Sequence, residues 1–110
     1  MVEENSRNIQ VVNAPKLNSF DLSKINSALD AAYDKLQKIV ANKMLLVLHF
    51  KESRKEGRRE NYGIHLRLSF PGRTLVASET GWDVVATVQK ALHVLERETV
   101  ESVKRRQEKV

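Results

Sequence analysis

A strict two-residue alternation in the middle of the chain most constrains its fold. Apolar residues occupy every even position from Tyr62 to Phe70, and small or polar residues fill the positions between them. Because successive side chains of a strand point to opposite faces, this pattern predicts a strand with one buried face and one wet face. The chain is therefore expected to contain a sheet that is covered on one side only.

The residues directly after this strand predict a tight turn. In Pro71-Gly72 the glycine suits the turn position that tolerates a positive φ, so the pair is expected to form a two-residue hairpin loop. This loop fixes the register of the next strand, whose apolar residues then face the same core. The expected pairs are Phe70 with Arg73, Leu68 with Leu75 and Leu66 with Ala77.

Two stretches have the periodicity of amphipathic helices. The first runs from about Asp21 and stops near Asn42, and its apolar face is formed by Leu22, Ile25, Leu29, Leu36, Ile39 and Val40. The second follows Gly81, which is expected to supply backbone freedom, and Asp83, which suits the first helical turn. Its apolar arc is formed by Val85, Val88, Leu92, Leu95 and Thr99, and the opposite side carries a column of cations spaced by seven, Lys90, Arg97 and Lys104.

The remaining segments complete a β-α-β-β-β-α order. Residues 8–12 predict a short strand, and the apolar run at the start of residues 43–53 predicts a central one. The polar stretch 51–61 is expected to be a mobile loop. We therefore predict an α+β fold in one domain over residues 1–110, with a four-stranded sheet, both helices packed on one face, and flexible ends at 1–6 and 105–110.

Composition and charge narrow the functional classes. The chain has no cysteine, which excludes disulfides and thiolate metal sites, and it has no apolar run long enough to enter a membrane. We expect a cytoplasmic protein. The net charge is +5, and the whole excess lies from Lys43 onward. Concentrated positive charge is what a nucleic-acid binder needs, although a solvated basic surface without a partner has the same composition.

Residues of the kinds that perform catalysis do not form a recognisable constellation. His49, His65 and His93 lack the spacing of metal ligands, and the sequence holds no glycine-rich phosphate loop. A nucleophile beside a base, or a pair of catalytic carboxylates, is also not apparent. We therefore expect no enzyme, no metal, no cofactor and no small-molecule substrate.

The order of residues at the end of the strand that follows Pro71-Gly72, and in the last helix, indicates a protein family. The relevant positions are Ala77, Ser78, Gly81, Asp83, Ala86, Leu92, Leu95, Glu96 and Arg97. This order resembles the ribosome hibernation factors, also called ribosome-associated inhibitor or sigma-54 modulation proteins, in a short form. The later part of the fold also resembles the double-stranded-RNA-binding domain. That class carries a lysine cluster at the start of its last helix, which residues 81–85 lack, so it ranks second.

The resemblance implies a function. Members of this family bind the small ribosomal subunit in the channel where mRNA and tRNAs sit, and they contact rRNA through basic side chains. Lys35 and Arg97 match basic positions of the family pattern. Three other basic positions of the family are occupied here by Ala32, Val94 and Glu101, and Asp30 and Asp34 add negative charge to the first helix.

These observations give a set of candidate rRNA-binding residues: Lys35, Lys38, Arg58, Arg59, Lys90, Arg97, Lys104 and Arg105. Trp82 could stack on a base or cover the edge of the core. The expected activity is translation inhibition by occupying the small subunit. The alternative is a diverged protein-interaction or regulatory module of the same fold with weak or no RNA binding. The sequence leaves self-association open.

Overall fold

The described part of the chain forms an α+β fold. The computed structural model describes residues 7–108, with the backbone but not the side chains of residues 52, 53 and 105–108. Its elements in chain order are β1 (Ile9–Val12), α1 (Ser19–Val40), β2 (Leu45–Glu56), β3 (Arg59–Phe70), β4 (Arg73–Gly81) and α2 (Val84–Glu108). The predicted order and fold class are confirmed. Of the ends expected to be flexible, residues 1–6, 109 and 110 lie outside the described residues.

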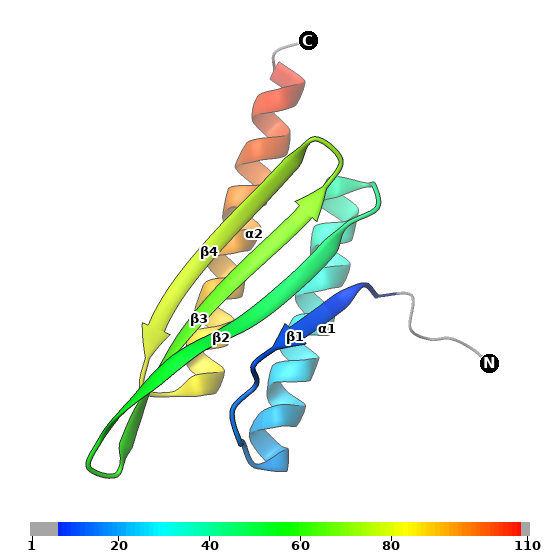
Figure 1. The fold of residues 1–110 in the computed structure, drawn as a ribbon. Helices are drawn as coiled ribbons and strands as arrows, with labels where there is room; N and C mark the ends of the chain where they lie inside the picture. Colours follow the sequence, from blue (N-terminus) through cyan, green and yellow to red (C-terminus); the bar gives the residue numbers. More distant parts are fainter. Residues whose placement is uncertain (1–6, 109–110) are drawn as a thin grey trace, which may run out of the picture.

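The four strands make one sheet in the order β1-β2-β3-β4. β1 is parallel to β2, whereas β2, β3 and β4 pair in antiparallel fashion. The parallel pair requires a crossover connection, which α1 supplies. Both helices lie on the same face of the sheet and run in the same direction (Figure 1), so the other face is open, as the alternation in β3 predicted.

The core lies between the inner face of the sheet and the two helices. The alternating residues of β3 are its centre, since Ile64, Leu66 and Leu68 are fully buried. The other fully buried side chains come from α1, β2 and α2, namely Leu29, Leu36, Leu46, Leu48, Val88, Leu95 and Thr99. Burial of apolar surface at this scale is the main stabilising contribution to the fold.

The turn between β3 and β4 has the predicted form. The register pairs Phe70 with Arg73, Leu68 with Leu75 and Leu66 with Ala77. Gly72 has a φ of 83°, which a residue with a Cβ adopts only with strain. The hairpin prediction and its register are therefore confirmed.

The prediction of a mobile loop over residues 51–61 is wrong. β2 continues to Glu56 and β3 begins at Arg59, so only Gly57 and Arg58 form the turn, with Gly57 at a φ of 61°. The pairing passes a β-bulge between Lys51 and Arg54 and then continues to the turn. This part of the hairpin projects past the neighbouring strands (Figure 1) and has no core to face, which explains why its sequence shows no alternation.

Side-chain caps define the helix ends. The Asn18 side chain accepts a hydrogen bond of 2.7 Å from the backbone N–H of Asp21, so α1 begins at Ser19, slightly before the predicted start. α1 ends with Ala41 in the left-handed region, at a φ of 53°, one residue before the predicted stop. Asp83 caps α2 as predicted, because its Oδ1 accepts a 3.0 Å bond from the N–H of Ala86.

Gly81 has a different role from the one expected. Its φ is not in the left-handed region, so backbone freedom does not explain it. A Cβ at this position would instead collide with the hydroxyl of Thr87. That hydroxyl donates a 2.7 Å hydrogen bond to the carbonyl of Asp83, and Gly81 therefore leaves room for a bond that closes the first turn of α2.

Candidate nucleic-acid interface

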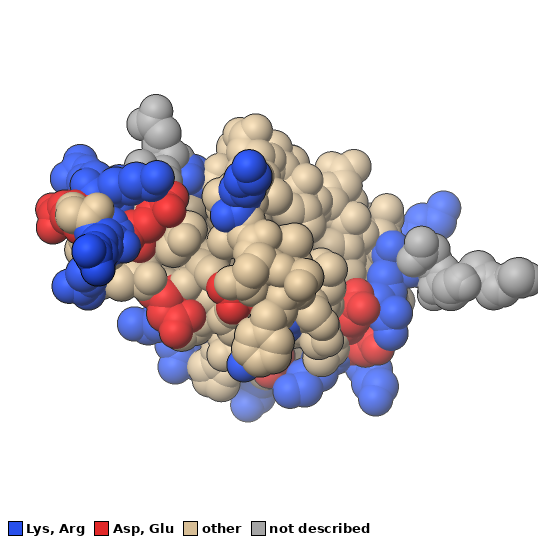
Figure 2. Space-filling model, turned by 90° about the horizontal axis from the view of Figure 1, so that it is seen from below, with Lys and Arg blue, Asp and Glu red and all other residues tan. Residues whose placement is uncertain are grey.

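The projecting end of the β2–β3 hairpin, residues 54–60, concentrates positive charge, and we call it the hairpin tip. It carries four cations, Arg54, Lys55, Arg58 and Arg59, against the two carboxylates Glu56 and Glu60. All four cations are exposed. Figure 2, which views the molecule from the end where the tip projects, shows blue side chains gathered on the side of the hairpin. The tip therefore presents a net positive surface away from the core.

A cation–π contact fixes one of these arginines. The guanidinium of Arg59 lies 4.3 Å from the centroid of the Trp82 ring. Trp82 lies between β4 and α2 and is 40% exposed. The ring of Trp82 therefore supports an arginine that stands directly after the turn of the hairpin. The contact lowers the conformational freedom of a cation that stays accessible to a ligand.

The predicted basic column on α2 is exposed but balanced by acidic neighbours. Lys90, Arg97 and Lys104 are all exposed, and the same stretch of helix, residues 84–104, also carries three carboxylates, Glu96, Glu98 and Glu101. The ammonium of Lys90 also lies 3.8 Å from a carboxylate oxygen of Glu79 on β4. The backbone of Arg105 continues α2, but its side chain lies outside the described residues. The lysines and arginines of residues 84–104 are therefore equal in number to the carboxylates of the same segment.

On α1 the candidate cations Lys35 and Lys38 are exposed. Lys35 borders the groove between the two helices, opposite His93 and Glu96. The acidic character expected on this helix is reduced by Arg7, whose guanidinium donates to both carboxylate oxygens of Asp34 at 3.0 and 2.9 Å. These hydrogen bonds hold the pKa of Asp34 below its ordinary value.

The structure explains two of the three missing family cations. Ala32 is 6% exposed and belongs to the core. Val94 is half-buried and packs against that core. At both positions an apolar side chain contributes to the packing of the helices. Glu101 is exposed, so packing does not explain why this position carries a carboxylate and not a cation.

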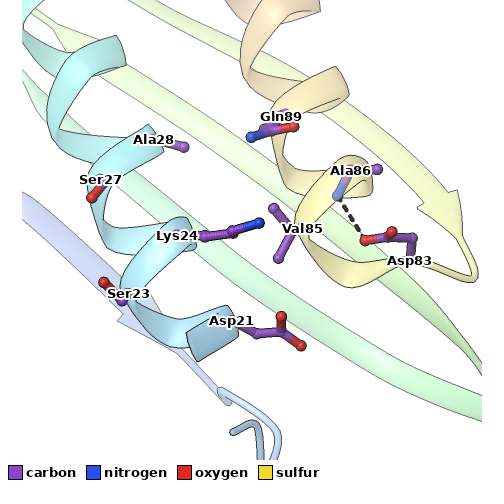
Figure 3. A pocket seen from close by; sticks show the side chains of 9 residues that line it. All are labelled: Asp21, Ser23, Lys24, Ser27, Ala28, Asp83, Val85, Ala86 and Gln89. Carbon is purple, nitrogen blue, oxygen red and sulfur yellow. Dashed lines mark hydrogen bonds between the residues drawn. The ribbon is translucent and has the colours of Figure 1, made fainter. Parts of the chain in front are cut away.

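A cleft of about 670 Å³ opens between the first turns of α1 and α2. Figure 3 shows Lys24 extending from α1 toward Val85 of α2, with Asp21 and Asp83 on the two helices. The Lys24 ammonium also lies 4.5 Å from the centroid of the exposed Phe20 ring. The lining residues do not include a histidine or a cysteine, and the carboxylate of Asp83 is used as a helix cap. This cleft has no arrangement for acid–base or nucleophilic chemistry.

Two histidines that are distant in the sequence meet on the open face of the sheet. His49 on β2 pairs directly with His65 on β3, and their side chains contact Asn13 at 3.2 Å and Ser78 at 2.9 Å respectively. Partial burial, reinforced by the nearby positive charge of Lys51, lowers the pKa of His65. In the sequence the two histidines lie on separate predicted strands, and only the register of β2 and β3 reveals that they are neighbours.

Among residues 7–108, no group of three or more potential ligands from His, Cys, Asp and Glu is placed to hold a metal ion. Neither helix of this part of the chain combines the length and apolarity that a membrane span requires.

Comparison with known proteins identifies the fold and the family. The model of the family "Hibernation factor Hib, C-terminal domain" matches residues 8–110. The solved N-terminal domain of Thermus thermophilus Protein Y is similar, with a TM-score of 0.61 and 12% identity over 86% of this chain and 96% of that chain. A ribosomal subunit interface protein from Coxiella burnetii has a TM-score of 0.55 and 14% identity over 86% and 94%. No curated protein sequence matches. The resemblance to hibernation factors is confirmed.

Proposed function

We propose that the chain, which belongs to the family of the hibernation factor Hib C-terminal domain, binds rRNA in the mRNA and tRNA channel of the small ribosomal subunit. Ribosome hibernation and ribosome association come with the family, which acts by binding rather than by catalysis. Beyond what comes with the family, we propose the small subunit as the partner and its mRNA and tRNA channel as the binding site. The contacting residues named below and a cytoplasmic location are also part of the proposal. Translation would be inhibited because the bound domain occupies space that mRNA and tRNA need.

The charge and placement of the hairpin tip are the observation that carries this proposal. Four exposed cations on a projecting two-stranded arm suit the phosphate backbone of RNA, since each neutralised phosphate releases condensed counterions. Because Trp82 holds Arg59 in place, less conformational entropy is lost when this arginine binds. The tip projects past the rest of the sheet (Figure 1), so it can approach RNA without steric interference from the helices.

The remaining candidate cations would act as a second, weaker contact surface. Arg97 and Lys104 point away from the core on α2, and Lys35 and Lys38 lie exposed on α1. Lys90 is partly engaged by Glu79, which lowers its value to a phosphate. Arg105 extends the basic sequence at the end of α2. We therefore expect Arg58 and Arg59 of the hairpin tip to contribute more to rRNA binding than the cations of the two helices.

One set of observations favours the alternative, a protein-interaction or regulatory module with weak RNA affinity. Residues 84–104 of α2 carry as many carboxylates as lysines and arginines, and the family cations at positions 32 and 94 are replaced by residues that pack into the core. A domain that kept the fold and lost the helix contacts would have these features. The two functions differ in whether binding to ribosomes depends on salt and on the hairpin tip.

Sucrose-gradient sedimentation with vacant ribosomes tests the proposal. The protein should sediment with the small subunit at low salt, be released as salt rises, and be displaced by mRNA with initiator tRNA. A variant with Arg58→Ala and Arg59→Ala should lose most of this binding, whereas Lys16→Ala, an exposed cation outside the candidate set, should bind normally. Protein that stays at the top of the gradient at low salt would refute ribosome binding by this domain.

A further inference from the structure

β4 has an unpaired edge. Among residues 7–108 it pairs only with β3, and Figure 1 shows its other side free along the border of the sheet. The strand is nine residues long and, after Arg73, carries no lysine, proline or bulge that would block another strand. Free edges of this kind are templates for strand addition. The opposite edge is much less suitable, because β1 has only four residues.

The backbone groups that point outward from this edge can be identified. The N–H of Leu46 on β2 donates to Asn8 on the β1 side, so the even residues of β2 face β1 and its odd residues face β3. The same alternation continues through the registers of β2 with β3 and of β3 with β4, so the odd residues of β4 bond to β3. Thr74, Val76, Ser78 and Thr80 therefore direct their N–H and C=O groups toward the free edge.

We infer that this edge binds a second copy of the chain, with the two β4 strands antiparallel about a twofold axis at Val76. In this register Val76 meets its counterpart and Thr74 meets Ser78, so outward-pointing groups bond to outward-pointing groups. Leu75 of each copy lies opposite Ala77 of the other. Arg73 lies opposite Glu79 at both ends of the interface, which places opposite charges together. This inference does not depend on the proposed function.

The charge pattern distinguishes this register from its neighbour. An axis at Ala77 would also satisfy the hydrogen bonds, but it would place Leu75 opposite Glu79 and Arg73 opposite Gly81. A carboxylate near a strand edge discourages pairing unless a cation meets it. In the register centred on Val76, Glu79 would lie between Lys90 of its own chain and Arg73 of the second copy.

The expected dimer has one continuous sheet of eight strands. Because the axis is perpendicular to the sheet, both pairs of helices would cover the same face and both open faces would join. The two hairpin tips would project from opposite ends, since antiparallel strands place them far apart. The tips are therefore not part of the interface, and dimer formation and RNA binding can be measured separately.

Sedimentation velocity over a range of protein concentrations tests the inference. The chain should show a monomer–dimer equilibrium, and Val76→Pro should raise the dissociation constant at least about tenfold. This proline removes an N–H that points to solvent in the monomer, and proline is tolerated there in an edge strand. If Val76→Pro does not fold, Val76→Lys gives the same test, because residue 76 is 53% exposed and two lysines would face each other at the axis. Val12→Lys on the opposite edge is the control.

Cysteine substitution tests the register in a chain that has no other cysteine. Under mild oxidation Val76→Cys should form a covalent dimer, since hydrogen-bonded pairs in antiparallel sheets have Cα atoms about 5.5 Å apart, within disulfide range. Thr80→Cys lies on the same face away from the axis and should crosslink far more slowly. A chain that is monomeric at all concentrations, or a dimer unaffected by Val76→Pro and Val76→Lys, would overturn the inference.

Discussion

The hairpin tip and the outer side of α2 look equivalent in the sequence, since each contains several cations within a short segment. In the structure they differ. The tip has twice as many cations as carboxylates, and one of its arginines is held by an aromatic ring. The described side chains of α2 have equal numbers of each, and Lys90 approaches Glu79. The spacing of basic residues therefore says little about binding until the acidic neighbours and the rigidity of each cation are known.

Charge reversal should produce the largest difference between the two surfaces. Arg58→Glu with Arg59→Glu should weaken small-subunit binding about a hundredfold, because two charge-assisted contacts of about 1.5 kcal/mol are lost and repulsion is added. Arg97→Glu with Lys104→Glu should cost less, about tenfold. Each lost phosphate contact should also reduce the slope of log affinity against log salt by roughly 0.7 to 0.9.

The salt-dependent affinities of these two variants would be measured side by side, with Arg97→Ala and the triple Lys90→Ala, Arg97→Ala, Lys104→Ala variant included. An unchanged slope in the tip variant, together with a collapsed slope in the triple variant, would transfer the binding site to α2. No change in either variant would remove the RNA-binding proposal and leave the fold unaffected.

The two hairpin turns sharpen the comparison between core and tip. Gly72→Val should lower the free energy of unfolding by about 1 to 3 kcal/mol, because Gly72 has a φ of 83° next to strands that carry the core. Gly57→Val introduces similar strain at a φ of 61°, but only in the projecting tip. It should affect global unfolding less, since the tip can open locally. Chemical denaturation of both variants checks this. Equal losses would show that the tip unfolds together with the core.

The contact between Arg59 and Trp82 should have a smaller effect. A double-mutant cycle with Arg59→Ala and Trp82→Leu should give a coupling free energy of about 0.5 to 1 kcal/mol, the usual range for an exposed cation–π pair. Denaturation of the four proteins supplies the stability values. Arg58→Ala with Trp82→Leu is the matched control and should show no coupling. A zero value for Arg59 would mean that the ring does not hold it in solution.

The smallest expected effect concerns His65, which lies on the open face of the sheet. Because the folded state lowers the pKa of His65 below its ordinary value, the neutral form is favoured by folding. The resulting stability is complete above the unfolded pKa and is lost as pH falls through the folded pKa. Stability should therefore fall slightly more between pH 7 and pH 5 in the natural chain than in His65→Gln. At pH 7.5, adding His65→Gln should leave the relative losses of ribosome binding in the tip and α2 variants unchanged.

Sequence patterns predicted the fold where a face of an element is buried. The alternation in β3, the Pro71-Gly72 turn and the apolar arc of α2 each record contact with the core, and the structure has all three. The projecting end of the hairpin was missed because neither of its faces packs on the core. Its strands are held together by backbone hydrogen bonds, and their turn depends on the positive φ of Gly57. Neither feature produces a periodic pattern of apolar residues in the sequence.

The candidate site was less predictable for a related reason. Cations could be listed from the sequence, but their neighbours come from other elements. Trp82 is 23 positions from Arg59, and Glu79 reaches Lys90 from a different layer. The burial of Ala32, which explains a missing family cation, depends on how α1 packs beside α2. Such contacts follow from the assembled fold rather than from local spacing.

The unequal connections of the sheet have a consequence for the order in which the chain folds. Two-residue turns join β2, β3 and β4, so these strands meet at small loop-closure cost. β1 reaches β2 only through the 22 residues of α1 and is the shortest strand. Formation of the sheet is therefore expected to start in the three-stranded meander and to end when β1 docks. The same strand would detach first in the native state, so its amide hydrogens should exchange with solvent sooner than those of β3.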